Sequence, residues 1–233
     1  AEVVGFEGDR LILAAEDSVN GLRPGAKVTL VGNSDQVQLG ADLLGRIIDG
    51  AGAPLDDMPL NLTDTAPIRG KPLNPMSRSG ISEPSDVGVR AINALLTVGR
   101  GQRIGLFAGS GVGKSTLLGM ITRFTDADVV VVGLVGERGR EVKEFIEDSL
   151  GPEGLKKSVV VAAPADTSAL MRVSCCWRAT AIAEHYRAQG LNVLLLMDSL
   201  TRFAQAQREI ALSAGEPPVA KGYTPSVFSL IPN

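Results

Sequence analysis

The stretch AGSGVGKST at residues 108–116 decides the fold of this chain. It follows an apolar run at residues 103–108 and precedes a helix-sized segment at residues 114–124. We predict a strand and a helix there, which is the context that a phosphate-binding loop requires. Ala108 stands where the strict pattern has glycine, but the remaining glycines still let successive backbone N–H groups approach an anion closely.

The residues of this loop have different expected roles. Lys114 is predicted to reach the β- and γ-phosphates of a nucleotide, and Ser115 to offer a hydroxyl to Mg²⁺. The helix that begins there directs its positive end at the phosphates. The alternative is that this segment is only a glycine-rich turn with a surface lysine. The position of Gly-Lys-Ser shortly after an apolar strand argues against that alternative. The predicted nucleotide-binding residues are Gly109, Ser110, Gly111, Val112, Gly113, Lys114, Ser115 and Thr116.

The chain around the loop has the pattern of an α/β fold. Continuous apolar runs predict further strands at residues 128–135, 158–163 and 192–197. Such runs without polar alternation are typical of a parallel sheet that helices cover on both faces. The segments between and after them predict helices at residues 139–150, 170–189 and 200–214.

The first 72 residues have a different pattern. Short β-rich runs at residues 10–14, 27–31 and 43–48 alternate with Gly, Asp and Pro turns, which favours a small antiparallel β-barrel. A proline-rich connector covers residues 64–84. We therefore expect a barrel over residues 1–72 and a nucleotide-binding α/β domain over residues 73–233.

Two acidic residues follow predicted strands. Asp198 ends an apolar strand and is expected to orient Mg²⁺, although it or Ser199 could instead cap the helix that begins at Leu200. Glu137 follows another strand, at the sheet edge where ligands bind in open α/β folds, and is the candidate to activate water. Its alternative role is that of a first-turn acid favoured by the helix dipole.

Composition limits the classes of function. The 233 residues carry a net charge of −3 and only 4% aromatic residues, which disfavours a nucleic-acid-coating protein. The longest apolar stretch has eight residues (129–136), against roughly 20 for a membrane-spanning helix. Cys175 and Cys176 are neighbours, which suits neither an ordinary cross-link nor a metal clamp and favours a reducing compartment. With Trp177 they are expected to anchor a helix in the core.

Four motifs carry a resemblance to a known family. They are FAGSGVGKS at 107–115, GLVGERGREVKEF at 133–145, MDSLTRF at 197–203 and AQREI at 206–210. Together they strongly resemble the ATPase of type III protein export, which is related to the catalytic subunits of rotary F-type and V-type ATPases. The segments AAPAD at 162–166 and PLNP at 72–75 are more similar to the flagellar branch than to the virulence-secretion branch.

The resemblance implies a RecA-like P-loop ATPase core preceded by a β-barrel. It implies a homohexamer at the cytoplasmic face of the inner membrane, which uses ATP and Mg²⁺ to assist protein export. The implied partners are stalk, regulator and gate proteins and chaperone–substrate complexes, with no nucleic acid. It also implies that the barrel starts late here, and that an adenine-packing aromatic residue, an arginine finger and a helical C-terminal domain lie beyond Asn233.

The resemblance assigns roles to single residues. Lys114 and Ser115 match the phosphate and Mg²⁺ contacts, Glu137 the catalytic carboxylate and Asp198 the Mg²⁺-side acid. Arg138 and Arg202 match charged groups near the γ-phosphate. The alternative for Arg202 is a helix-start arginine that pairs with Glu209.

Two other functions remain open on the sequence. An RNA translocase with a related ATPase core would need a basic or aromatic surface to bind RNA, and this composition disfavours such a surface. A subunit that binds ATP without hydrolysing it does not need a carboxylate beside the attacking water. The presence of Glu137 therefore favours an ATP-hydrolysing enzyme over such a subunit.

Overall fold

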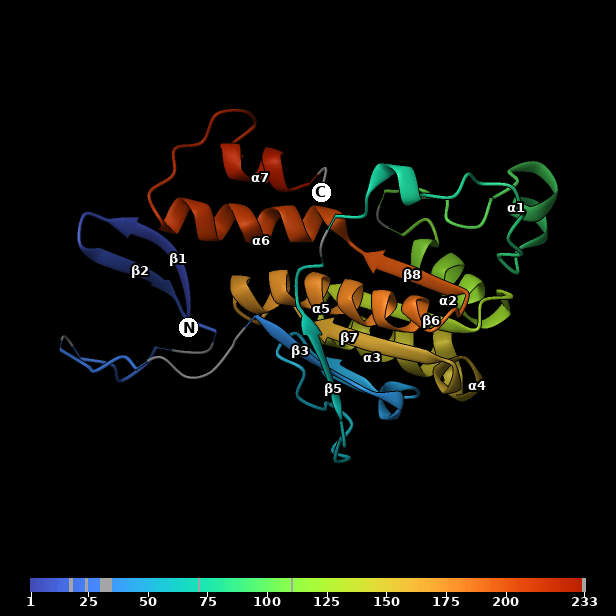
Figure 1. The fold of residues 1–233 in the computed structure, drawn as a ribbon, viewed down its shortest axis with the longest axis horizontal. Helices are drawn as coiled ribbons and strands as arrows, with labels where there is room; N and C mark the ends of the chain where they lie inside the picture. The colour runs from blue at the N-terminus through green and yellow to red at the C-terminus, as the bar shows by residue number, and fades with distance from the viewer. Residues whose placement is uncertain (17–18, 24, 30–34, 71, 110, 232–233) are drawn as a thin grey trace.

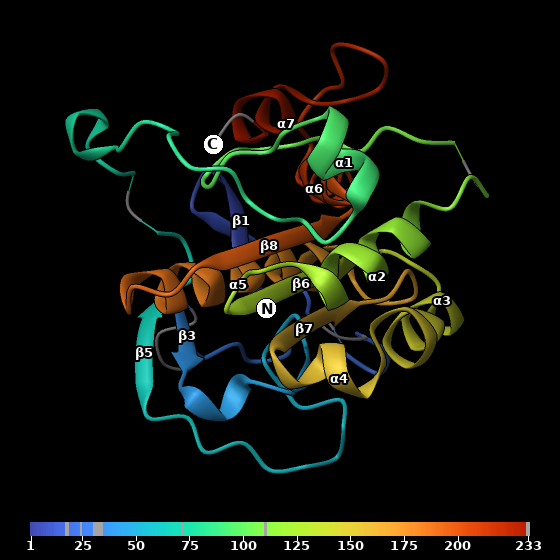
Figure 2. The same ribbon diagram turned by 90° about the vertical axis from the view of Figure 1, so that its right-hand side faces the viewer.

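A four-stranded parallel sheet, in the order β4-β7-β6-β8, forms the centre of the molecule, and helices cover both of its faces (Figure 1, Figure 2). The computed structural model describes residues 1–16, 19–23, 25–29, 35–70, 72–109 and 111–231. The strands of the central sheet are β4 (Ile47–Asp49), β6 (Val129–Val135), β7 (Ser158–Ala163) and β8 (Val193–Asp198). The helices are α1 (Arg90–Leu95), α2 (Lys114–Phe124), α3 (Gly139–Glu144), α4 (Gly151–Lys156), α5 (Ala169–Ala188), α6 (Leu200–Ser213) and α7 (Pro225–Leu230).

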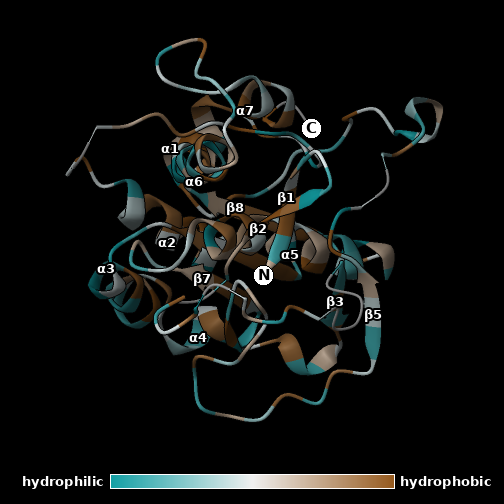
Figure 3. Ribbon diagram, turned by 90° about the vertical axis from the view of Figure 1, so that its left-hand side faces the viewer, coloured by the Kyte–Doolittle hydropathy of each residue, from teal (hydrophilic) through white to brown (hydrophobic). Residues whose placement is uncertain are grey.

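The two middle strands, β6 and β7, are buried along their whole length. Their valine-rich sequences favour strands because β-branched side chains pack well on a pleated surface. Alternate side chains face opposite sides: Val131 and Val161 pack in the cluster with α5 and α6, while Val132 packs in the cluster with α2 and α3. Figure 3 shows that hydrophobic residues gather in these central layers. Among the described residues, no helix combines the length and the apolar character needed to cross a bilayer.

Most predicted elements of the α/β part are confirmed. The strand β7 and the helix α2 have the predicted bounds. The elements β6 and α6 differ from prediction by one residue at one end, and β8 and α5 by one residue at both ends. The helix predicted at residues 139–150 is present, but its second half, Phe145–Leu150, is a π-helical segment that leads into α4. The predicted α/β class with a parallel sheet is therefore confirmed.

The strand predicted at residues 103–108 is wrong for this structure. None of these residues is in a strand, and Ile104 and Phe107 are 55% and 97% exposed. Strand propensity reflects packing against neighbours, and this segment has no pairing partner within the described part of the chain. The predicted phosphate-binding loop is thus preceded by an exposed segment that forms no strand.

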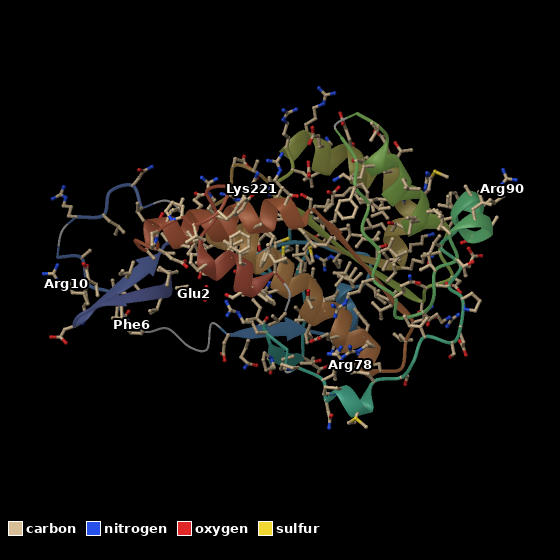
Figure 4. The ribbon with its side chains drawn as sticks, turned by 90° about the horizontal axis from the view of Figure 1, so that it is seen from above. Glu2, Phe6, Arg10, Arg78, Arg90 and Lys221 are labelled. Carbon is tan, nitrogen blue, oxygen red and sulfur yellow. The ribbon has the colours of Figure 1, made fainter. Side chains whose placement is uncertain are left out.

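The N-terminal part differs from the predicted barrel. The strands β1 (Glu2–Glu7) and β2 (Arg10–Ala14) form one antiparallel pair, and β3 (Gln36–Leu39) and β5 (Asp64–Pro67) form another. The strand β4 pairs with β7 instead, so this segment belongs to the core sheet. The described residues therefore do not confirm a closed barrel. Figure 4 shows Phe6 and Arg10 on the β1–β2 hairpin at one end of the molecule.

Two other strand predictions in this part need correction. The run at residues 43–48 begins as a single helical turn, Ala41–Leu43, and becomes a strand only at Ile47. Of the run predicted at residues 27–31, residues 27–29 are not in a strand and residues 30–31 lie outside the described part. A hydrophobic pattern could not locate these boundaries, because turn geometry and strand pairing determine them. The division at residue 72 stays a prediction.

A nearly buried ion pair joins β4 to the loop that follows it. The Arg46 guanidinium donates from Nε and Nη2 to the two Asp56 carboxylate oxygens, both at 2.7 Å. Arg46 Nη1 also donates to the Pro59 carbonyl at 2.9 Å. The side chains of the pair are 10% and 12% exposed. This bidentate contact fixes the start of β4 and the loop at residues 50–59.

We expect Asp56→Ala to destabilise the chain by about 3 kcal/mol at pH 7, because it leaves the nearly buried Arg46 charge without its carboxylate partner. The Arg46 guanidinium lowers the pKa of Asp56 from 3.8 to about 2. A lowered carboxyl pKa stabilises the fold above about pH 4, and this contribution is lost as the pH falls through 2.

The measurement is urea unfolding of the parent and the variant between pH 7 and pH 3. The difference in unfolding free energy should shrink at the acid end. The exposed Asp148→Asn is the control, and equal stability of all three proteins at pH 7 would contradict the expectation.

Candidate functional site

The phosphate-binding loop ends in a backbone that only glycine adopts easily. Gly111 and Gly113 have φ values of +78° and +92°, and α2 begins at Lys114 directly after them. A side chain at either position would strain this left-handed backbone. The loop thereby presents the first turn of α2, including the exposed Ser115 and Thr116, to one end of the sheet. Of the other predicted residues, Gly109 and Val112 are exposed, and Ser110 lies outside the described residues.

Asp198 and Lys114 meet directly. Asp198 ends β8 and is 5% exposed, and its Oδ1 accepts a hydrogen bond from Lys114 Nζ. The two residues lie 84 positions apart in the sequence, and the predicted convergence of loop and strand end is thus present. The direct ion pair was not predicted, because sequence spacing shows nothing about which side chains touch.

Asp198 does not cap the following helix. The cap of α6 is Ser199, whose Oγ accepts from the backbone N–H of Arg202 at 3.4 Å. Of the two roles open on the sequence, the structure therefore gives capping to Ser199 and leaves the Asp198 carboxylate facing Lys114.

Glu137 lies beside this pair because β6 and β8 are adjacent. Leu134 of β6 is in register with Asp198 of β8, and Glu137 follows three residues later at the same edge. The intervening Gly136 has φ +68°, and its N–H donates to the Ala163 carbonyl at 2.7 Å. This turn brings the half-buried Glu137 side chain next to the loop lysine.

The surroundings of Glu137 raise its pKa above the ordinary value of 4.5. Burial is the largest cause, followed by the Asp198 charge and a hydrogen bond with Glu141. Lys114 and Arg202 oppose the rise through their positive charges. A carboxylate with a raised pKa is a stronger base, which suits a group that takes a proton from water. The sequence pattern gave no reason to single out Glu141 for this effect.

The two predicted arginines differ in position. The stem of Arg202 packs against Gly136, where a Cβ would lie 3.0 Å from the Arg202 Cβ, so a glycine is needed for this approach. The alternative pairing of Arg202 with Glu209 does not form, since Glu209 bonds Arg172 at 2.7 Å. Arg138, in contrast, has a side chain that is 84% exposed and lies 3.4 Å from Glu141. The structure thus brings Arg202 to the site and leaves Arg138 at its outer rim.

The donor set fits a magnesium ion that is shared with bound phosphates. Ser115 offers an exposed hydroxyl at the start of α2, and Asp198 offers a carboxylate whose present partner is a mobile lysine. Both are hard oxygen ligands, which Mg²⁺ prefers, and Mg²⁺ sites commonly take the remaining ligands from phosphates and water.

Cys175, Cys176 and Trp177 pack in the core around α5, as predicted. Cys175 and Cys176 are 0% and 6% exposed within α5, and Trp177 packs edge-on against Phe203 with ring centroids 5.9 Å apart. Burial raises the pKa of Cys176 to about 12, so its thiol stays neutral. His185 on the same helix pairs with Gln189 at 2.8 Å. These residues anchor α5 and take no part in the site.

Comparison with known proteins decides the family. Residues 88–233 match the model of the ATP synthase alpha/beta family, nucleotide-binding domain. The chain belongs to this family. This member of the ATP synthase alpha/beta family is 59% identical over 233 residues to the flagellum-specific ATP synthase of Pseudomonas aeruginosa. It is 51% identical over 233 residues to the type 3 secretion system ATPase of Xanthomonas euvesicatoria.

The solved structures agree with this family. Two structures of the assembled ATPase EscN from the enteropathogenic E. coli type III secretion system, one in complex with its central stalk EscO, match 99% of the chain. Both have a TM-score of 0.93 and 46% identity, and the match covers 56% and 57% of those chains. All of this chain matches the two named relatives, but only 52% and 53% of their length. The chain thus spans about half the length of the curated relatives it matches. The resemblance predicted from the four motifs is confirmed.

Proposed function

We propose that this chain binds and hydrolyses ATP with Mg²⁺ as the catalytic part of a type III protein-export ATPase. One observation carries the proposal: Lys114, Asp198 and Glu137 meet at the carboxyl edge of a parallel sheet. A phosphate-binding lysine, a metal-side acid and a base are the groups that phosphoryl transfer to water requires.

Each residue has a part in the proposed reaction. Lys114 turns from Asp198 toward the β- and γ-phosphates. Ser115 and Asp198 would hold Mg²⁺, which would neutralise phosphate charge. Glu137 orients a water and takes its proton as that oxygen attacks the γ-phosphorus, while the bond from the γ-phosphorus to the β–γ bridging oxygen breaks and ADP leaves. Arg202 stabilises the negative charge that develops on the transferring group.

The wider function is proposed from the named relatives. Flagellum-specific and type 3 secretion ATPases are both similar over the whole chain, and we favour the flagellar branch. In the complete protein we propose a homohexamer at the cytoplasmic face of the inner membrane, in contact with stalk, regulator and gate proteins. ATP turnover there would release export substrates from their chaperones. The named assembly of EscN with a central stalk supports a ring with such a partner.

Phosphate release from Mg²⁺-ATP by the complete protein tests the proposal. We expect release to require Mg²⁺ and to be unaffected by single-stranded RNA, because the chain carries a net charge of −3. Stimulation by RNA would favour the translocase alternative. Binding of ATP without any release would favour the non-hydrolysing subunit.

The raised pKa of Glu137 predicts the acid side of the pH profile. Because the base must be deprotonated, turnover should rise with pH through the Glu137 pKa, which lies above the ordinary 4.5. Glu141→Gln removes a hydrogen-bonding carboxylate that raises this pKa, so the midpoint of the acid limb should move to lower pH. The measurement is kcat/KM for Mg²⁺-ATP between pH 5 and 8, which reports the pKa of the free enzyme. An acid limb that stays in place in the variant would contradict the assigned contact.

A further inference from the structure

A cavity of about 560 Å³ lies away from the phosphate-binding loop, between α5, the strands β3 and β5, and the turn after β4. In Figure 1, β3 and β5 lie directly beside α5. Its volume is within the range of roughly 300–1,000 Å³ that small-molecule sites occupy. A second cavity of about 330 Å³ shares Gln36, Ala51 and Arg178 with it. The residues proposed for ATP hydrolysis line neither cavity.

Arg178 is a buried charge without an ionic partner in the described part of the chain. It is 8% exposed and lines both cavities. Its Nε donates to the Gly50 carbonyl at 3.0 Å, which leaves Nη1 and Nη2 without an acceptor among the described residues. Asp49 raises its pKa through its negative charge but forms no ion pair with it among the described residues, and Asp49 Oδ1 accepts from the Ala51 and Ala53 N–H groups.

The local backbone is shaped to leave this guanidinium room. At Gly52, which has φ +94°, a Cβ would lie 2.7 Å from Arg178 Nη1. Burial of a cation is unfavourable unless an anion pairs with it, and burial lowers the pKa of Arg178. Among the described residues, the guanidinium therefore has a fixed Nε, two terminal nitrogens that bond no acceptor, and a cavity in front of it. This is the arrangement that receives a planar oxyanion.

The other charged residues that line the cavity restrict the charge that a bound ligand can carry. Arg69 lies over the Trp177 ring, 5.1 Å from its centroid, and supplies a second cation. Glu2, Glu16 and Asp35 also line the cavity and would repel a dianion. An acid with a single carboxylate and a neutral or positive far end fits this distribution.

We propose that this cavity is a binding site for a small monocarboxylic acid whose carboxylate pairs with Arg178. The site is separate from the proposed ATP site, and its occupation would tie α5 to the turn after β4. Trp177, which is the single tryptophan of the chain, lines the cavity and serves as its reporter.

The test is a titration of Trp177 fluorescence with matched small molecules at constant ionic strength. The probes are butyrate, 4-aminobutyrate, butyramide and inorganic phosphate. We expect both acids to bind at least about tenfold more tightly than the uncharged amide, which corresponds to about 1.4 kcal/mol. Phosphate should bind more weakly than either acid, because the acidic lining repels it.

Variants of Arg178 test whether the fluorescence change comes from binding at this residue. Arg178→Met should abolish acid binding, Arg178→Lys should retain part of it, and Arg187→Met on the exposed side of α5 should leave it unchanged. Circular dichroism shows whether each variant is folded. If Arg178→Met does not fold, the acid and amide pair on the parent chain decides the matter alone. Equal affinity for butyrate and butyramide, tighter binding of phosphate, or no saturation by either acid up to about 50 mM (roughly 1.8 kcal/mol) overturns the proposal.

Discussion

Lys114→Ala is expected to weaken ATP binding at least about 30-fold, a loss of about 2 kcal/mol. The change removes the flexible cation that the loop places beside Asp198, and with it the charge-assisted bonds to the β- and γ-phosphates. The backbone N–H groups of the loop remain and account for any residual affinity. A fluorescent ATP analogue titrated against parent and variant measures the effect.

The control for this variant is Lys143→Ala. Lys143 lies on α3 in an exposed ion pair with Glu147 at 3.7 Å, outside the site. Because Lys114→Ala leaves the Asp198 carboxylate buried without its partner, circular dichroism of the variant must accompany the titration. A folded Lys114→Ala chain whose affinity stays within about threefold of the parent, or about 0.7 kcal/mol, would show that the phosphate-loop assignment is mistaken.

Glu137→Gln should separate binding from chemistry. The amide keeps the size of the side chain and one acceptor oxygen but loses the charge that takes a proton from water. We expect nucleotide affinity to remain near that of the parent, while turnover in the complete protein falls by about 10² or more. Nucleotide titration and phosphate release on the same preparation measure the two quantities.

Glu144→Gln on α3 is the matched control. Glu144 bonds the exposed Arg140 at 2.6 Å and lies away from the site, so turnover should be unaffected by its loss. If Glu137→Gln hydrolyses ATP at the parental rate, the base is a different residue, and Glu137 is only an acid that precedes the N-cap of α3. Loss of binding and turnover together would instead assign Glu137 to nucleotide binding.

Local patterns were sufficient for the buried core. The valine-rich runs of β6 and β7 predict strands because a β-branched side chain suits a pleated surface wherever both faces are covered. The bounds of α2 also follow from local sequence, since the loop glycines end where helix formers begin. The edges of the structure were less predictable. Residues 103–108 have strand propensity, but they form no strand without a neighbour that bonds them.

The sequence by itself determined the chemistry available to this protein: the glycine loop with Lys114, and acids that follow buried strands. The tertiary structure decided which of these groups act on one another. The register between β6 and β8 places Glu137 beside Asp198. Arg202 can pack against residue 136 only because Gly136 has no side chain. Only the fold could show that Arg178 is buried and that it forms no ion pair with a carboxylate of the described residues. Local propensity acts over a few residues, whereas burial and charge pairing depend on segments that lie far apart in the chain.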